Sequence, residues 1–378
     1  MNCANRIALE FLNLVKGVLY TVSGITNKIK LRIGYVLAFI VLMLMVFGCK
    51  EKPSNLNTLN TNKQYGVASS TLSPDNKKIV FSLSEIPGRT DIAVFNIQTK
   101  ELKRINPTGK SCLAPVYSHD GKRMAFASGV NDDWNVFVMN ADGTNIRQLT
   151  QNYNTGKKLR DGSYQLFTIN GGGTFSPDGE KIIFLRSRVK RQRSMGGEMV
   201  SHWDVYEVDL ATGKERQLTD YRYYTASRPY YLPDSKGVIF SATGAKGAVP
   251  EEMSGKTLNQ ILIVDDNKSY PYLAFEHDNY AIEPSISGKG DIAFVSRNNE
   301  FDSLNKKYTY DIFMRKRGKT TRLTMENFST IADPFISFDG SLVVFLASKT
   351  HNEGPALWLV KADGTSVTYI GRPWNPTK

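Results

Sequence analysis

The sequence predicts an all-β protein, a six-bladed β-propeller built from four-stranded antiparallel blades. The first basis is a turn segment, "FSPDGEKIIF" at residues 175–184, whose variants occur six times at intervals of 45 to 58 residues. The second is the segment after each copy: an aromatic or β-branched run, another turn such as "NADGT" at 140–144, and a short strand ending like "RQLT" at 147–150. Four strands repeated six times are typical of a propeller, in which each repeat is one blade of a closed ring.

The repeated turn contains residue types with clear local roles. Its fourth position is Lys289 in one copy and aspartate in the other five: Asp75, Asp120, Asp178, Asp234 and Asp339. Aspartate accepts hydrogen bonds from backbone N–H groups two residues on, and glycine tolerates positive φ, so we expect the aspartates to form the turns. A Phe follows each of these aspartates six residues later, on a strand with alternating apolar neighbours, and we expect it to pack between blades.

The "SPDG…I.F" and "DG…QLT" patterns resemble the TolB-like (WD40-like, PD40) propeller repeat over about residues 66–371. The resemblance implies a propeller that is TolB-like rather than TolB itself, because TolB also has an N-terminal α/β domain. The roughly 15 residues between Cys49 and the first repeat cannot supply that domain. Two modes of ring closure stay open: the first and last blades pack together without exchanging strands, or a strand from about 62–67 joins the last blade.

The N-terminal segment is typical of a secretory signal. "KIKLR" at 28–32 precedes an apolar run that ends at Gly48, and "VFGC" at 46–49 resembles a bacterial lipoprotein cleavage box. The alternative is an uncleaved transmembrane anchor, for which a run of about 16 apolar residues is short. We therefore expect a lipoprotein-type signal segment at 1–48 and lipidation of Cys49.

The rest of the chain divides into three predicted parts: a polar, flexible tether at 49–65, a monomeric propeller at 66–371, and a C-terminal tail at 372–378. A lipidated Cys49 anchors such a protein in the bacterial cell envelope. Lys50 after the cysteine favours the outer membrane, and the periplasmic and surface faces both stay open.

The loop lengths predict a binding face. In a four-stranded blade the "SPDG" and "ADG" turns share one face of the disc, which we call the turn face. The opposite loop face carries the connections between the second and third strands, which are long in blades 3–5, at 185–203, 241–259 and 295–310. Binding residues concentrate on loops held by a rigid scaffold, so we expect the partner on the loop face of blades 3–5.

Basic and aromatic side chains gather in and near these loops. The predicted partner-binding residues are Arg186, Arg188, Lys190, Arg191, Arg193, Tyr221, Tyr223, Tyr224 and Arg228. Arginine binds anions through two parallel hydrogen bonds and tyrosine offers a stacking surface, so the expected partner is an envelope protein or an anionic glycan. Nucleic acid suits the same residue types but is not expected for an exported protein. The simpler alternative is a solvated charged loop without a partner.

No catalytic site is predicted. The chain lacks a G-x-S-x-G nucleophile motif, and its four histidines have no metal-ligand spacing, so neither a metal nor another cofactor is expected. We therefore predict a non-catalytic binding scaffold. The alternative is a propeller enzyme that acts on acidic polysaccharide and is similar to oligogalacturonate lyases, with His202, Arg186, Arg188 and Arg228 in the central funnel.

Overall fold

The computed structural model describes residues 64–130, 133–152, 164–191, 198–243, 260–265, 272–274, 281–302, 307–350 and 353–374. The regular elements in these ranges are strands, and no helix there has the length and apolar character needed to cross a membrane. The chain divides into two compact units between Asn55 and Leu56, and the second unit contains the propeller. The predicted signal segment, Cys49 and nearly all of the predicted tether lie outside the described residues.

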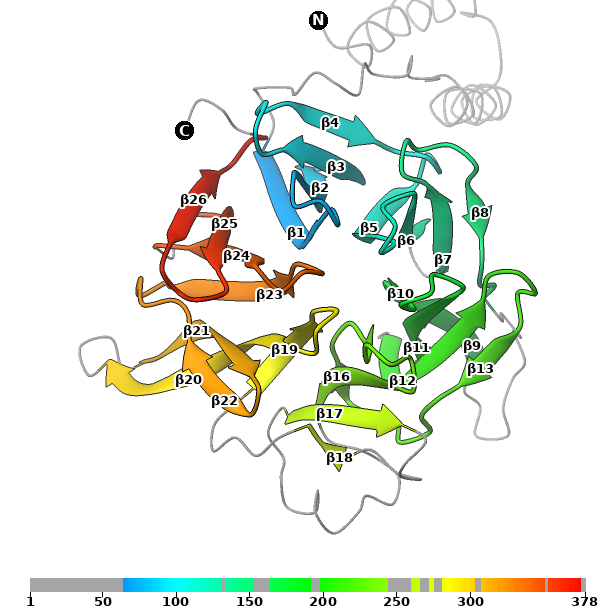
Figure 1. Ribbon diagram of the computed structural model, residues 1–378. Coiled ribbons are helices and arrows are strands. Elements are labelled where there is room, and N and C mark those ends of the chain that lie inside the picture. The colour runs from blue at the N-terminus through cyan, green and yellow to red at the C-terminus, as the bar shows by residue number, and fades with distance from the viewer. Residues whose placement is uncertain are drawn as a thin grey trace, which may run out of the picture. The chain divides into compact units, whose positions relative to one another are not determined.

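Six sheets, each made of strands that follow one another in sequence, surround a common centre (Figure 1). Blade 1 contains β1 (Gln64–Leu72), β2 (Lys78–Ile86), β3 (Thr90–Asn96) and β4 (Leu102–Ile105). Blade 2 contains β5 (Ser111–Tyr117), β6 (Arg123–Val130), β7 (Asp133–Asn140) and β8 (Arg147–Gln148). Blade 3 contains β9 (Tyr164–Asn170), β10 (Thr174–Phe175), β11 (Lys181–Arg191), β12 (Glu198–Asp209) and β13 (Glu215–Gln217).

The second half of the ring repeats this order. Blade 4 contains β14 (Thr225–Ala226), β15 (Tyr230–Tyr231), β16 (Gly237–Thr243), β17 (Gln260–Asp265) and β18 (Tyr272–Leu273). Blade 5 contains β19 (Ala281–Ile286), β20 (Ile292–Asp302), β21 (Lys307–Lys316) and β22 (Lys319–Arg322). Blade 6 contains β23 (Thr330–Ile336), β24 (Leu342–Ser348), β25 (Ala356–Lys361) and β26 (Val367–Gly371). The innermost strand is split in two in blades 3 and 4, and the predicted six-bladed architecture is confirmed.

The aspartates of the repeated turn hold the first hairpin of their blades. In blade 1 the Asp75 carboxylate accepts hydrogen bonds from the Ser73 hydroxyl at 2.6 Å and from the Lys77 N–H at 3.1 Å. Asp120, Asp178 and Asp339 make the same contact with the serine two residues before them. Because the serine hydroxyl also caps the turn backbone, this pair fixes the reversal of the chain at the turn face.

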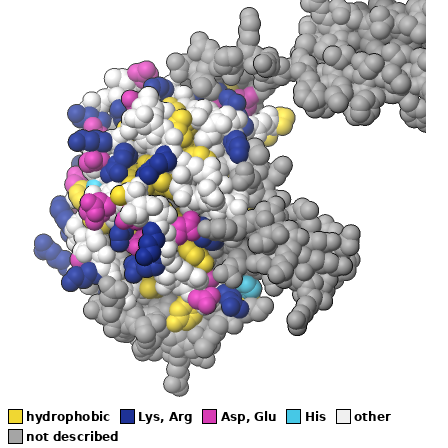
Figure 2. All heavy atoms as spheres, turned by 90° about the vertical axis from the view of Figure 1, so that its right-hand side faces the viewer, with side chains coloured by type: hydrophobic (Ala, Val, Ile, Leu, Met, Phe, Trp, Pro, Cys, Tyr) yellow, Lys and Arg dark blue, Asp and Glu magenta, His cyan; other side chains and the backbone are white. Residues whose placement is uncertain are grey.

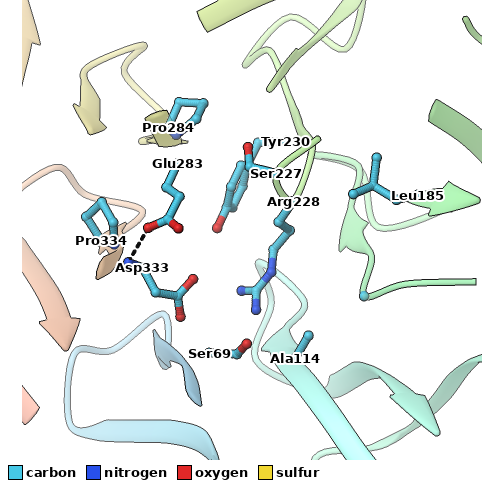
Figure 3. Close-up of a pocket in the computed structure, with 11 residues that line it drawn as sticks. Ser69, Ala114, Leu185, Ser227, Arg228, Tyr230, Glu283, Pro284, Asp333 and Pro334 are labelled. Carbon is cyan, nitrogen blue, oxygen red and sulfur yellow. Dashed lines mark hydrogen bonds between the residues drawn. The ribbon is translucent and has the colours of Figure 1, made fainter. Parts of the chain in front are cut away.

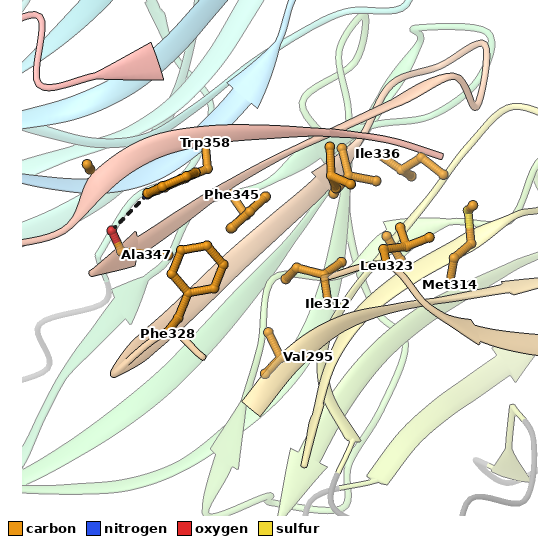
Figure 4. Packing of buried hydrophobic residues seen from close by; sticks show 13 residues of the cluster. Val295, Ile312, Met314, Leu323, Phe328, Ile336, Phe345, Ala347 and Trp358 are labelled. Atoms are coloured by element: carbon orange, nitrogen blue, oxygen red, sulfur yellow. Dashed lines mark hydrogen bonds between the residues drawn. The ribbon is translucent and has the colours of Figure 1, made fainter. Parts of the chain in front are cut away.

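The hydrophobic core lies between blades. The six phenylalanines of the repeat are fully buried, at 0% exposure: Phe81, Phe126, Phe184, Phe240, Phe294 and Phe345. Figure 4 shows one interface, where Val295 and Ile312 of blade 5 pack against Phe345 and Trp358 of blade 6. Burying one Phe side chain stabilises the fold by about 1.5–3 kcal/mol, so the repeated Phe makes each blade depend on its neighbour.

The threonine of the "QLT" ending joins the outer strand to the third strand. The Thr219 hydroxyl donates to the Asp204 carboxylate at 2.8 Å and accepts from the Val205 N–H at 2.9 Å. The same bridge occurs at Thr150 with Asn135 and at Thr324 with Asp311. The motif therefore satisfies a buried acidic or amide side chain at the loop-face end of the third strand.

The ring closes by packing among the described residues. Strand β1 pairs with β2 of its own blade, and the first and last blades meet in a shared hydrophobic cluster. Trp374, after the last strand, is 3% exposed and packs on Phe81 with ring centroids 5.3 Å apart. At the turn face the Asn76 amide donates to Asp339 at 3.1 Å. Of the two predicted modes of closure, the structure has the one without strand exchange.

Candidate binding site on the propeller axis

One equivalent residue from each innermost strand faces the propeller axis. It lies six residues before the fourth position of the repeated turn, and the six members are Ser69, Ala114, Gly172, Arg228, Glu283 and Asp333. Together they line a cavity of about 200 Å³, which we call the axial cavity. Each blade supplies one residue of this ring, so the repeated fold creates the cavity. The six residues at this position determine its polarity and charge.

Local backbone geometry aims these residues inward. Ser69, Ala114, Glu283 and Asp333 have φ between 52° and 54°, and the pairing register shifts around each of them. A β-bulge leaves one residue out of the ladder and redirects its side chain, and a positive φ is uncommon outside glycine. A proline follows in four of the six blades, which the sheet tolerates because the innermost strand is an edge strand.

The charged members of the ring come from three consecutive blades. Blades 1–3 supply the small residues of the ring, whereas blades 4–6 supply Arg228, Glu283 and Asp333. Figure 3 shows the Arg228 guanidinium extended across the cavity toward Ser69 and the Asp333 carboxylate. The Asp333 N–H donates to Glu283 Oε2 at 2.6 Å and thereby links blades 5 and 6.

Two polar atoms of the axial cavity are buried without a hydrogen-bond partner among the described residues: Arg228 Nη1 and Asp333 Oδ2. Leaving a buried donor or acceptor unsatisfied costs about 1–3 kcal/mol, and more for charged groups. Most buried polar groups in folded proteins are paired, so two unpaired atoms of opposite charge in one cavity indicate a place for a polar ligand.

Burial shifts the titration of the cavity carboxylates. Burial, and then the nearby Asp333, raise the pKa of Glu283 to about 6. Burial also raises the pKa of Asp333, against the opposing effect of the Arg228 charge. The pKa of Tyr230 is raised to about 12, mainly by burial, so its hydroxyl stays protonated at neutral pH. A partly protonated Glu283 thus shares the cavity with a cationic Arg228.

The axis is blocked at the turn face. The Phe338 ring of blade 6 packs at a tilt against His119 of blade 2 with centroids 4.6 Å apart, and the Phe338 carbonyl accepts the Gly288 N–H of blade 5 at 2.9 Å. Blades 2 and 5 are opposite in a ring of six, so a residue that contacts both lies on the axis. A Cβ at Gly288 would come within 2.7 Å of the Phe338 ring, so only glycine fits there.

Phe335 fills the axis between this block and the cavity. It packs against three hydrophobic clusters, those of blades 6 and 1, blades 2 and 3, and blades 4 and 5. Its ring lies 6.2 Å from that of Tyr230. Phe335 therefore forms an aromatic floor on the turn-face side of the cavity.

Of the predicted basic cluster, the structure describes the side-chain contacts of Arg186. Arg186 is 7% exposed, binds Glu215 through two hydrogen bonds of 2.7 and 2.9 Å, and donates to Asn170 at 2.7 Å. It therefore lies inside blade 3 and not on an exposed rim. Arg188, Lys190 and Arg191 belong to the end of β11, and Arg193 lies outside the described residues. The side of the disc in Figure 2 shows Lys and Arg mixed with Asp and Glu.

The predicted tyrosines have three different environments. Tyr223 is 1% exposed and belongs to the core between blades 3 and 4, whereas Tyr221 is half-buried. Tyr224 is 59% exposed and its ring lies 5.4 Å from that of His202. Of the predicted partner-binding residues, Arg228 lines the axial cavity.

Sequence reasoning missed Glu283, Asp333 and Tyr230. The available signal was the proline that follows Arg228, Glu283 and Asp333 at the same place in the repeat. Of the residues proposed for a lyase-like funnel, Arg228 is at the axis, whereas His202 and Arg186 are elsewhere. Within the described ranges, no group of three His, Cys, Asp or Glu side chains is arranged to hold a metal ion.

The protein is a six-bladed propeller with a polar axial cavity, and known proteins with similar repeats and a similar fold can be compared with it. The TolB beta propeller domain family, PD40, matches residues 49–193, which confirms the TolB-like resemblance of the repeats. The structure is similar to that of TolB from Acinetobacter baumannii, with 19% identity and a TM-score of 0.53. That match covers 85% of this chain and 65% of TolB, so the chain spans less than two thirds of that protein's length.

The solved structures of two enzymes are also similar in fold to this chain. An oligogalacturonate lyase in complex with manganese has 14% identity and a TM-score of 0.53, with 83% of this chain and 79% of the lyase covered. A puromycin-hydrolyzing peptidase from Mycobacterium tuberculosis has 10% identity and a TM-score of 0.52, with 85% and 56% covered. At such identities the likeness shows the propeller fold alone.

Proposed function

We propose that this chain is a non-catalytic binding protein of the cell envelope, which holds a protein or an anionic glycan on its loop face. In this proposal the axial cavity receives a charged group of the partner. The observation that carries it is the pair of buried, unpaired atoms Arg228 Nη1 and Asp333 Oδ2 in a cavity with a closed floor. A partner that satisfies these atoms recovers the free energy lost when they were buried.

The remaining predicted contacts form the outer part of the proposed interface. Arg188, Lys190 and Arg191 lie at the end of β11, Arg193 lies in the connection from β11 to β12, and Tyr224 is an exposed aromatic residue. Lipidated Cys49 would place the propeller at the outer membrane, where such a surface meets envelope proteins and acidic polysaccharides. Charges at the edge of an interface mainly speed association, whereas a buried anchor lowers dissociation.

Cross-linking in cells tests this proposal. A photo-cross-linker in place of exposed Tyr224 captures the partner, which is identified by mass spectrometry and quantified for each variant. We expect Arg228→Gln to reduce capture about tenfold or more, because a hydrogen bond to a charged group contributes about 1.5–3 kcal/mol. Arg147→Gln is the matched control, since Arg147 is exposed on the outer strand of blade 2. Equal capture by both variants refutes the axial anchor.

One observation favours an enzyme as the second candidate. Glu283, with its pKa raised to about 6 by burial and by Asp333, is suited to act as a general base, and Arg228 beside it is suited to hold a uronate carboxylate. Glu283 would take the proton α to that carboxylate, the glycosidic C–O bond would break, and the leaving oxygen would take a proton from Tyr230. The products would be an unsaturated uronate and a shortened chain.

Ultraviolet absorbance of the unsaturated product tests this candidate. Polygalacturonate incubated with the protein should gain absorbance that Glu283→Gln abolishes while binding of the polymer persists. A flat trace with wild-type protein that binds the polymer removes the lyase and leaves the binding function.

A further inference from the structure

We propose, resting on the binding function above, that the axial cavity recognises a compact zwitterion. Such a group carries one carboxylate and one ammonium on neighbouring atoms, as an α-amino acid does. Arg228 would hold the carboxylate, and Asp333 with Glu283 would hold the ammonium. The basis of this assignment is that one guanidinium nitrogen of Arg228 and one carboxylate oxygen of Asp333 are unpaired in the same small cavity.

The donor side of the site suits a carboxylate. A guanidinium presents parallel N–H groups in a planar fork that matches two carboxylate oxygens. Nη1 of Arg228 is buried and lacks a partner among the described residues, so a donor is free at the place where the cavity is lined by small side chains. Ser69 and Ala114, toward which the guanidinium points in Figure 3, leave room for the ligand there.

The acceptor side suits an ammonium. Asp333 Oδ2 is buried without a partner in the described part of the chain, and the Glu283 carboxylate lies beside it, held by the Asp333 N–H. An ammonium has three donors and no acceptor, so it can bond to both carboxylates at once. These acceptors come from blades 5 and 6 and the donor from blade 4, so a ligand that bridges them also ties three blades together.

Charge balance favours a zwitterion over a ligand that carries one sign of charge. A plain anion bound to Arg228 would sit beside the Asp333 and Glu283 carboxylates, and a plain cation bound to these would face the guanidinium. Like charges repel strongly in a partly buried site, and this repulsion offsets part of the attraction to the opposite charge. A zwitterion meets an opposite charge at each end and avoids both penalties.

The dimensions favour a small head group. The cavity of about 200 Å³ is smaller than the roughly 300–1,000 Å³ of drug-sized ligand sites. Gly172 is packed so tightly on Ala114 that a Cβ there would come within 2.3 Å of the Ala114 Cβ, so this wall does not widen. The cavity therefore admits a free amino acid or the zwitterionic end of a longer molecule that enters from the loop face.

Isothermal titration calorimetry with charge-matched probes tests the inference. Alanine carries both charges, N-acetylalanine only the carboxylate, and alaninamide only the ammonium. We expect alanine to bind at least about tenfold more tightly than either analogue, because each analogue lacks one of the two charges that the cavity pairs. An analogue that binds as tightly as alanine, or no binding of alanine to folded protein, overturns the zwitterion.

Variants separate the two ends of the site. Arg228→Gln should abolish the preference for alanine over alaninamide, and Asp333→Asn should abolish the preference for alanine over N-acetylalanine. Arg147→Gln and Asp220→Asn are matched controls on exposed side chains and should bind as wild type does. Loss of both preferences in either single variant would indicate collapse of the site and contradict the assignment of its two ends.

A further probe distinguishes the sources of the head group. In γ-glutamylalanine the glutamate keeps its α-ammonium and α-carboxylate and is extended through its side chain. Binding of both alanine and γ-glutamylalanine indicates a larger partner that carries the zwitterion, whereas binding of alanine alone indicates a free amino acid. If no zwitterion binds but Arg228→Gln loses the cross-linked partner, the inference fails and the proposed function stands. If alanine binds to the wild-type protein but Arg228→Gln still captures the cross-linked partner, the proposed function fails and the zwitterion site stands.

Discussion

Replacement of Glu283 by glutamine should change how stability depends on pH. The pKa of Glu283 is raised from 4.5 to about 6, first by burial and then by Asp333, so the folded state binds a proton that the unfolded state has lost between these two values. Stability falls as pH rises wherever the folded state binds more protons. The Glu283 contribution is therefore present below pH 4.5 and is lost as pH rises through 6.

The size of the effect follows from the shift. One pKa unit corresponds to about 1.4 kcal/mol, so the change from 4.5 to about 6 corresponds to about 2 kcal/mol of stability lost by wild type. Glutamine cannot ionise and still accepts the Asp333 N–H through its amide oxygen. We expect Glu283→Gln to match wild type near pH 4.5 and to exceed it by about 2 kcal/mol at pH 7.

Urea denaturation followed by intrinsic fluorescence, repeated from pH 4 to pH 7.5, measures this difference. Glu101→Gln is the control, because Glu101 is exposed just before β4 and lies outside the axial cavity. A difference between Glu283→Gln and wild type that stays constant with pH would refute the desolvated carboxylate at the axis. A difference that grows toward low pH would show that Glu283 is held ionised.

Three further predictions concern the scaffold around the site. Trp374→Ala should lower the free energy of unfolding by about 3 kcal/mol and expose the interface of blades 1 and 6 first to hydrogen exchange; a loss below about 1 kcal/mol contradicts its part in ring closure. Thr219→Val leaves the buried Asp204 without its hydroxyl donor and should cost about 1–3 kcal/mol in urea denaturation, and a neutral result contradicts the bridge. Phe338→Ala should raise the pKa of His119 toward its ordinary value in an NMR titration, because burial is what lowers that pKa, and an unchanged titration argues against the aromatic block.

The number and order of the blades could be predicted from the sequence because they depend on local chemistry. Turn formation by Asp75 and its equivalents needs only neighbouring backbone groups, and the alternation around Phe184 needs only the two-residue period of a strand. Repetition made these local signals unmistakable. The threonine of "QLT" was visible as a motif, but its bond to Asp204 requires the third and fourth strands to be paired.

Side-chain environment was less predictable than strand order. Arg186 belongs to a basic run that reads as a solvated loop, yet it points into blade 3 because the strand continues and places Asn170 and Glu215 beside it. Tyr223 is buried for a similar reason, since it forms an isolated bridge with Trp203 that draws the link into the core. Composition indicates charge and size, whereas the direction of a side chain follows from its register in the sheet.

The sequence by itself determined that this chain is a six-bladed propeller whose repeats resemble those of TolB-like proteins, with a regular turn face and a variable loop face. Only the tertiary structure decided what the centre of the ring contains. Arg228, Glu283 and Asp333 are separated by about 50 residues each along the chain, and no local pattern joins them. They meet because closure of the ring brings equivalent positions of every blade to one axis, and because bulges turn Glu283 and Asp333 inward. The charge of the cavity is therefore a property of the assembled ring.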